Sequence, residues 1–272
     1  MSQKQKERIG GVSYKTIERA LKAWRPVAVP ARTGNVGCLS REYGVEFVER
    51  VRHVTGPGYI CMDTVLHGGR STAGSFMWSV TWTDVWSGYT LNYAIWNSSF
   101  AEMKKAFDYF LGNTPFEIIS INVDNGREFF NRMALEYWTK EKGVKVTHSR
   151  PMMKNDNAHA EQRNKTHVRG LFARHRIDEE SDVRWANHIY RLNNLKYNYM
   201  IPCRVLVNRE LKKDKQRYRR VYDKAKTPAE RLLASPEVSA ENKQRIRATA
   251  EECNFVKISV KLKVTLDKFY ER

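Results

Sequence analysis

YICMDTV (59–65) and IISINVD (118–124) are two short, mostly apolar runs that each contain one aspartate, Asp63 and Asp124. An ionised carboxylate inside an apolar strand is costly to desolvate unless it meets a cation. Asp124 ends its run and precedes a turn signal, Asn125-Gly126, which places its carboxylate at the edge of a sheet. Both runs therefore predict strands of a buried sheet whose acidic groups serve a purpose other than packing.

The regions around these runs alternate between strand and helix patterns. β-branched and aromatic residues predict three more strands, over 76–84, 88–96 and 143–149. Helical spacing and capping residues predict three helices, over 99–111, 128–142 and 157–175. The resulting order is three strands, helix, strand, helix, strand, helix, which is typical of a mixed α/β fold.

The flanking regions are expected to be mainly helical. Helical patterns cover 12–24, 39–52 and 182–199. Thr227-Pro228-Ala229-Glu230 is a capping box with proline at the first helical position, and Ser239 begins another helix. The tail 255–269 is ambiguous, because its apolar residues fit both the alternation of a strand and the stripe of a helix.

Glu161 lies about one turn into the helix expected over 157–175. With Asp63 and Asp124 it gives three carboxylates that converge from two strands and a helix, a set of oxygen ligands suited to Mg²⁺ or Mn²⁺. Two such ions, roughly 3.5–4 Å apart, can activate the attacking hydroxyl and stabilise the leaving oxygen in phosphodiester transfer. This pattern predicts a nucleic-acid-processing site.

Three other acids fit ordinary roles. Asp84 and Asp156 are interpreted as residues that form a turn and begin a helix, and Glu128 as favourable charge in the first turn of its helix. His159 and His167 are interpreted as loop or DNA-facing residues, since a two-metal site needs no histidine base. The tryptophans at even spacing are interpreted as strand-face packing, and they are Trp78, Trp82 and Trp86.

VDNGREF (123–129) and RPMMKNDNAHAEQRNKTHVR (150–169), placed after the first apolar run, resemble the catalytic core of retroviral integrases and bacterial insertion-sequence transposases, the DDE family. The resemblance covers about residues 59–200, and 36 residues separate Asp124 from Glu161, close to the spacing of that family. The two motifs together are specific, whereas Asp-Asn-Gly alone would be a weak signal.

The resemblance implies an RNase H-like fold, with a five-stranded mixed sheet and helices on both faces. It also implies metal-dependent 3′-end cleavage and strand transfer of a mobile element, with two divalent ions, Mg²⁺ or Mn²⁺, as cofactors. Asp63, Asp124 and Glu161 map onto the catalytic, metal-binding acids of the family, and Lys165 onto a DNA-contacting lysine. No counterpart of the zinc-binding N-terminal domain of retroviral integrases is recognised.

The net positive charge of the chain indicates a polyanionic partner. Lys and Arg outnumber Asp and Glu by 48 to 30, which gives a formal net charge of +18. Residues 1–58 carry 11 basic and 5 acidic residues, 59–162 carry 10 and 11, and 163–272 carry 27 and 14. A charge far beyond the roughly 2–8 that suits solubility in a small domain favours double-stranded DNA, held by its phosphates on the flanks.

The predicted domains follow this division. Residues 1–58 form a basic region with a partial helix-turn-helix-like helix, 59–200 the RNase H-like core, and 201–272 a basic, mainly helical extension.

Lys165 and Arg169 follow Glu161 by four and eight residues, so on a continuous α-helix they share its face and bring cations to DNA phosphates. The alternative for Lys165 is a surface ion pair with Glu161. Further predicted DNA contacts are Lys154, Lys212, Lys213, Arg217, Arg219 and Arg220.

The four cysteines lie far apart, without a Cys-x-x-Cys pair or a histidine at zinc-ligand spacing, which disfavours structural zinc and disulfides. No apolar run reaches the roughly 18 residues needed to span a bilayer, and the N-terminus lacks a signal peptide pattern. We therefore expect a cytoplasmic protein. The resemblance further implies a bacterial, nucleoid-associated protein that works as a homo-oligomer on DNA.

Two other functions remain open. An RNase H-like nuclease would cut DNA without joining it, and a domesticated or truncated transposase would bind DNA without catalysis. A joining assay separates the three by its products.

Overall fold

The computed structural model describes residues 36–48, 54–123, 126, 128–149, 158–211 and 218–272. The chain divides into two units, residues 1–38 and 39–272, and the description below concerns the second unit together with helix α3 (Val36–Glu42). The helix predicted over 12–24 lies outside the described residues. The division into three domains at 58 and 200 stays a prediction.

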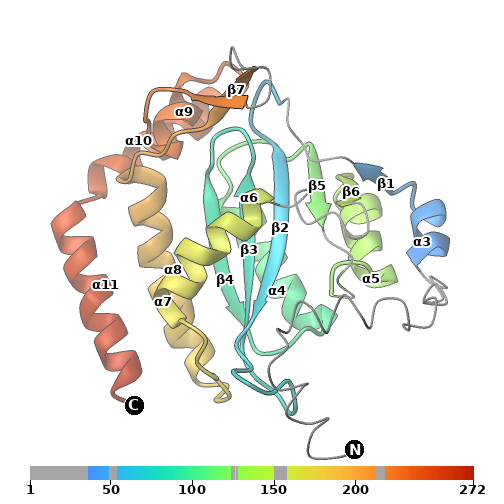
Figure 1. Ribbon diagram of the computed structural model, residues 1–272, viewed down its shortest axis with the longest axis vertical. Coiled ribbons are helices and arrows are strands. Elements are labelled where there is room, and N and C mark those ends of the chain that lie inside the picture. Colours follow the sequence, from blue (N-terminus) through green and yellow to red (C-terminus); the bar gives the residue numbers. More distant parts are fainter. Residues whose placement is uncertain (1–35, 49–53, 124–125, 127, 150–157, 212–217) are drawn as a thin grey trace, which may run out of the picture. The chain divides into compact units, whose positions relative to one another are not determined.

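A six-stranded sheet forms the centre of the described part (Figure 1). Its strands are β1 (Glu46–Val48), β2 (Tyr59–Leu66), β3 (Trp78–Asp84), β4 (Thr90–Ile95), β5 (Ser120–Val123) and β6 (Lys145–Ser149). They lie in the order β1-β6-β5-β2-β3-β4. β2, β3 and β4 form an antiparallel meander, while β5 pairs parallel to β2, β6 to β5 and β1 to β6.

This topology confirms the predicted α/β, RNase H-like core. Three antiparallel strands precede two parallel ones that lie on the other side of β2, which gives the expected five-stranded mixed sheet. β1 adds a sixth strand at the edge beyond β6.

The helices follow the predicted order through the core and continue beyond it. Those in the core are α4 (Phe100–Asn113), α5 (Arg132–Glu136), α6 (Ala158–Arg163), α7 (Arg169–Phe172) and α8 (Asp182–Tyr199). Two π-helical turns interrupt them, η1 (Tyr137–Glu141) after α5 and η2 (Asn164–Val168) between α6 and α7. The extension contains α9 (Pro228–Ala234), α10 (Ala240–Glu252) and α11 (Phe255–Tyr270).

Neighbouring residues of β3 show how the two faces of the sheet are covered. The ring of Trp82 packs against Phe110 of α4 and Trp138 of η1, with centroids 5.2 and 5.9 Å apart. Thr81 points to the opposite face, where its hydroxyl reaches Asn164 of η2. Because successive side chains of a strand point to opposite faces, α4 and η1 cover one face, and the α6–η2–α7 segment covers the other (Figure 1).

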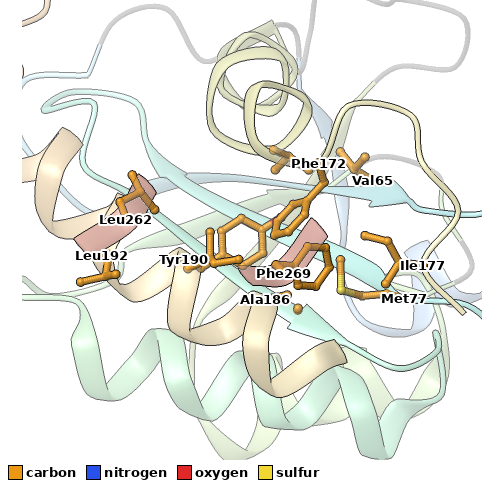
Figure 2. Close-up of a cluster of buried hydrophobic side chains, with 12 residues drawn as sticks. Val65, Met77, Phe172, Ile177, Ala186, Tyr190, Leu192, Leu262 and Phe269 are labelled. Carbon is orange, nitrogen blue, oxygen red and sulfur yellow. The ribbon is translucent and has the colours of Figure 1, made fainter. Parts of the chain in front are cut away.

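A cluster of buried apolar side chains joins α8 to the sheet and to α11 (Figure 2). Phe172 packs edge-on against Tyr190 and Phe269, with ring centroids 5.4 and 5.3 Å apart. Leu262 and Phe269 of α11 are both buried. The C-terminal helix is therefore part of the same hydrophobic core as α7 and α8, which a sequence boundary at residue 200 does not suggest.

Asparagines of α8 cover the outer edge of β4. Asn187, Asn194 and Asn198 each accept a hydrogen bond from a backbone N–H of β4 and donate one to the carbonyl of the same residue. The Asn198 pair is with Thr90, at 2.8 and 2.7 Å. These amides take the place of a neighbouring strand, so the edge is closed against pairing with another chain.

Several local predictions are confirmed by the caps. Ser99, Thr227 and Ser239 each accept a hydrogen bond from the backbone of the first turn of α4, α9 and α10, and Thr227 with Glu230 completes a capping box. The ambiguous tail is helical, because Leu262 and Phe269 lie on the helix face that packs against the core.

Two predicted helices differ from the structure. The helix expected over 39–52 ends at Glu42, because Gly44 adopts a left-handed backbone conformation (φ +62°) and residues 46–48 then pair as β1. The helix expected from Glu128 begins instead at Arg132, because Asn131 provides the cap by accepting from the N–H of Ala134.

The C-terminal extension is not wholly helical. β7 (Leu206–Leu211) and β8 (Tyr218–Tyr222) form an antiparallel two-stranded sheet within the Lys/Arg-rich run. No helix in the described part of the chain is both long enough and apolar enough to cross a membrane.

Candidate active site

Asp63 lies in the middle of β2, half-buried, with its side chain directed to the sheet face that η2 covers. Its Oδ1 accepts a hydrogen bond from the N–H of Thr64 at 2.9 Å, and its Oδ2 accepts one from Nδ2 of Asn164 at 2.6 Å. Both oxygens of the carboxylate are therefore held by N–H donors. The strand thus presents an oriented carboxylate at the position predicted from the sequence.

Asn164 is three residues after Glu161 and is buried, with 7% of its surface exposed. Its amide bridges Asp63 on β2 and the hydroxyl of Thr81 on β3. The segment that carries Glu161 is therefore fastened to the strand that carries Asp63, which brings two of the three predicted motifs together.

Glu161 lies in the first turn of α6 and its side chain is exposed. The expected continuous helix after it is interrupted, because residues 164–168 form the π-helical turn η2. Such turns accommodate one extra residue and occur frequently at functional sites. The helix is therefore not regular as far as Arg169, eight residues after Glu161.

Lys165 and Arg169 differ accordingly. Lys165 is exposed, whereas the guanidinium of Arg169 is partly buried and donates to the carbonyls of Ala173 and Leu66 at 3.1 and 3.3 Å. Burial, followed by the charge of Arg174, lowers the pKa of Arg169 from its ordinary value. Arg169 thus ties α7 to the end of β2, in addition to any role towards DNA.

The other predicted DNA contacts divide into two groups. Arg219 and Arg220 lie exposed on β8, beside the exposed rings of Tyr218 and Tyr222. Lys154, Lys212, Lys213 and Arg217 lie outside the described residues.

Asp124, the second predicted acid, also lies outside the described residues. Within the described part of the chain, no three His, Cys, Asp or Glu side chains come together as a metal site. The chemistry of the predicted donor set nevertheless fits a hard divalent cation, because it consists of carboxylate oxygens and Asp63 is held in an orientation set by two N–H donors.

Glu128 is placed differently from its predicted role. It precedes α5 and its Oε1 accepts a hydrogen bond from the hydroxyl of Thr64 at 2.7 Å. It therefore connects the loop after β5 to the residue that follows Asp63, instead of supplying charge to a helix N-terminus.

Two histidines near the site are buried. His167, expected to face a loop or DNA, is 1% exposed and stacks on Tyr197, with ring centroids 4.1 Å apart. Burial, followed by the charge of Arg163, lowers its pKa to about 3. His67 Nε2 lies 2.8 Å from the Ser79 hydroxyl, and burial lowers its pKa also to about 3. Both rings are neutral at pH 7. Because its ring is buried, the expectation that His167 faces a loop or DNA is wrong.

The supporting residues of Asp63 were not found from the sequence. Thr81 and Asn92 look like ordinary polar positions of alternating strands, and Asn164 like a polar position of a surface helix. One signal was available: Asn164 follows the apolar Ala160 by one helical turn, so it belongs near the inward side of that helix.

The fold is an RNase H-like core, and Asp63 lies on β2, a central strand of its sheet. Residues 55–153 match the family described as "Integrase core domain", in agreement with the resemblance of the motifs.

One relative and several solved structures are similar to the chain. The uncharacterized protein y4rM of Sinorhizobium fredii is 30% identical over 146 residues, which is 54% of this chain and 41% of that protein. The chain therefore spans less than half the length of this relative.

Two of these solved structures are integrase catalytic cores. The catalytic core domain of BIV integrase is 14% identical with a TM-score of 0.40, covering 53% of this chain and 86% of that one. The HTLV-2 integrase catalytic core domain in complex with magnesium is 14% identical with a TM-score of 0.41, covering 56% and 93%.

Proposed function

We propose that this chain is a DNA transposase or integrase that cleaves the 3′ ends of a mobile element and joins them to target DNA. Asp63, Asp124 and Glu161 would hold two Mg²⁺ or Mn²⁺ ions. The observation that carries the proposal is the 2.6 Å hydrogen bond from Asn164 to Asp63, because it links the helix of the third motif to the strand of the first. The match of residues 55–153 to the integrase core domain supports it.

Each described residue has a distinct part in this proposal. When bound, the two ions would lower the pKa of the attacking hydroxyl and stabilise the leaving oxygen. Asp63 binds as a rigid ligand, because Thr64 and Asn164 hold both of its oxygens. Glu161 approaches from α6, with its exposed side chain free of packing constraints. Lys165 is exposed one turn later, within reach of a phosphate backbone bound along the segment.

Double-stranded DNA is the proposed partner, with the chain acting as a homo-oligomer on the element ends. Basic residues outnumber acidic ones by 27 to 14 over 163–272, and the exposed surface of β8 offers Arg219 and Arg220 between Tyr218 and Tyr222. Guanidinium groups neutralise phosphates, and tyrosine hydroxyls donate to them. The β7–β8 hairpin is therefore proposed as a DNA-backbone contact.

A joining assay tests the function. Labelled duplexes that carry the ends of the DNA segment encoding the chain are incubated with the full chain, a target plasmid and Mg²⁺. The proposal expects labelled ends joined to the plasmid. Cut ends without joined product would identify a nuclease instead, and a mobility shift without either product would identify a DNA-binding protein.

A further inference from the structure

A series of hydrogen bonds runs from half-buried Asp63 into the buried interior of the sheet. Asn164 donates to Asp63 at 2.6 Å, the Thr81 hydroxyl donates to Oδ1 of Asn164, and Nδ2 of Asn92 donates to the Thr81 hydroxyl at 2.8 Å. Thr81 and Asn92 are fully buried, on neighbouring strands β3 and β4. We call these four residues the Asp63 network.

The chemistry of each group sets the direction of the network. An ionised carboxylate only accepts, so Asn164 must present its NH₂ to Asp63 and its carbonyl to Thr81. A threonine hydroxyl has one proton, so Thr81 donates to that carbonyl and accepts from the NH₂ of Asn92. The opposite orientation of the Asn164 amide would place its carbonyl against the carboxylate and leave buried groups unsatisfied, which is costly in a low-dielectric interior.

Asn92 is itself held in place from α8. Its backbone N–H donates to Oδ1 of Asn194 at 3.1 Å, and its carbonyl accepts from Nδ2 of Asn194 at 3.2 Å. The inner end of the Asp63 network is thus fixed by a second helix and is closed to solvent.

We propose that Thr81 and Asn92 are positioning residues for Asp63. By fixing the amide orientation of Asn164, they hold the Asp63 carboxylate in the direction in which it binds a divalent cation. This inference rests on the proposed function only for the identity of the ligand. Groups that orient a metal ligand typically contribute 10–100-fold to metal affinity, although they never touch the metal.

The same strand provides a matched control. Thr83 lies two residues from Thr81, on the same face of β3, and is also buried, with 2% of its surface exposed. Its hydroxyl lies 3.3 Å from that of Thr90, and it makes no bond to the Asp63 network. Thr81→Val and Thr83→Val therefore remove one buried hydroxyl each from equivalent surroundings, and only the first breaks the network.

The first measurement is the Mn²⁺ affinity of the full chain without DNA, by calorimetric titration. Thr81→Val should weaken binding by about 10-fold or more, whereas Thr83→Val should leave it unchanged. Thr81→Ser keeps the hydroxyl and should restore most of the affinity. Asn92→Ala should have a smaller effect than Thr81→Val, because Thr81 can still donate to Asn164, and it serves in place of Thr81→Val should that variant not fold.

The second measurement follows the side-chain NH₂ signal of Asn164 by NMR, in the absence of metal. Hydrogen exchange of this group should be slow in the wild type and in Thr83→Val, and faster in Thr81→Val. This readout reports on the network whether or not the chain has the proposed activity.

The outcomes separate the two proposals. Equal Mn²⁺ affinity in Thr81→Val and Thr83→Val, with tight binding in the wild type, would overturn the positioning role. A wild type that binds no Mn²⁺ and neither cuts nor joins DNA, yet shows slow exchange at Asn164 that Thr81→Val abolishes, would overturn the proposed function and leave the network standing.

Discussion

Glu161 is the acid for which a single substitution is most informative. Its side chain is exposed near the start of α6, so it contributes little to packing. Glu161→Gln keeps the size and the helix propensity of the residue but removes a negative charge from the proposed metal site. Cleavage and joining should both fall by at least about 100-fold, since one set of ligands serves both steps. DNA binding and the free energy of unfolding should be nearly unchanged.

Glu128→Gln is the matched control for this prediction, because a glutamine carbonyl can still accept the hydrogen bond from Thr64. We expect it to keep most of the activity, as should Asp156→Asn. Near-normal joining by Glu161→Gln together with loss of joining by Glu128→Gln would show that the third ligand is wrongly assigned.

Asp84 is a buried carboxylate with a structural role. Its oxygens accept hydrogen bonds from the N–H of Gly58 and from the N–H and hydroxyl of Ser87, at 2.6–2.9 Å. Asp84→Asn would turn an NH₂ group towards these donors. We expect the free energy of unfolding, measured with urea at pH 7, to fall by about 1–3 kcal/mol.

The pKa of the Asp84 carboxyl also predicts how the free energy of unfolding depends on pH. Burial raises the pKa of Asp84 from 3.8 to about 6, against the opposing effect of its hydrogen bonds to Ser87. A raised folded pKa contributes stability that is complete below pH 3.8 and is lost as the pH rises through 6. The difference in unfolding free energy between wild type and Asp84→Asn should therefore be larger at pH 4.5 than at pH 7. A difference that shrinks on acidification would contradict this assignment.

At the scale of elements, the edge of β4 depends on side chains of α8. Asn198→Leu would leave the buried N–H and carbonyl of Thr90 without partners. Because two buried groups lose their partners, we expect the free energy of unfolding, measured by heat or urea, to fall by about 2–4 kcal/mol.

Asn193→Leu makes the same change on the same helix at a buried asparagine whose Nδ2 has no hydrogen-bond partner among the described residues. It should cost less than Asn198→Leu. Equal losses for the two variants would mean that the asparagine pairs do not stabilise the strand edge.

The elements that the sequence predicts well are those with strong local signals. The β2–β4 meander, the α4 cap at Ser99 and the capping box at Thr227 all follow from alternation or from side chains that bond the nearby backbone. Residues 46–48 were mistaken for helix, because their strand pairing with β6 depends on residues about 100 positions away. Tertiary pairing of this kind leaves no local pattern.

The candidate site is likewise only partly predictable from the sequence. Asp63 is predicted because a carboxylate in an apolar strand is unusual. The structure places its side chain on the sheet face that the α6–η2–α7 segment covers. Its partners Asn164, Thr81 and Asn92 were not predicted, because their polar side chains have no distinctive spacing and meet only in the folded chain.

For the whole molecule, the distribution of charge predicts how DNA is held. Arg219→Glu with Arg220→Glu should weaken duplex binding and reduce the slope of log affinity against log salt by about 2, since each phosphate contact contributes about 1. The measurement is fluorescence anisotropy over a range of salt concentrations.

Lys104→Glu with Lys105→Glu is the control of equal charge, because these lysines, the first partly and the second fully exposed, lie on α4, across the sheet from Asn164. It should change the slope much less. Identical slopes for the two double variants would mean that DNA responds to net charge alone and that the β7–β8 hairpin is not a specific contact.

The central claim is that Asp63, Asp124 and Glu161 hold divalent ions that make this chain a DNA-joining enzyme. The most direct measurement is the joining of labelled element ends to a plasmid by the full chain, in Mg²⁺, in Ca²⁺ and in excess chelator. We predict joined product in Mg²⁺, DNA binding without product in Ca²⁺, and no product in chelator. Undiminished joining in excess chelator would contradict the account.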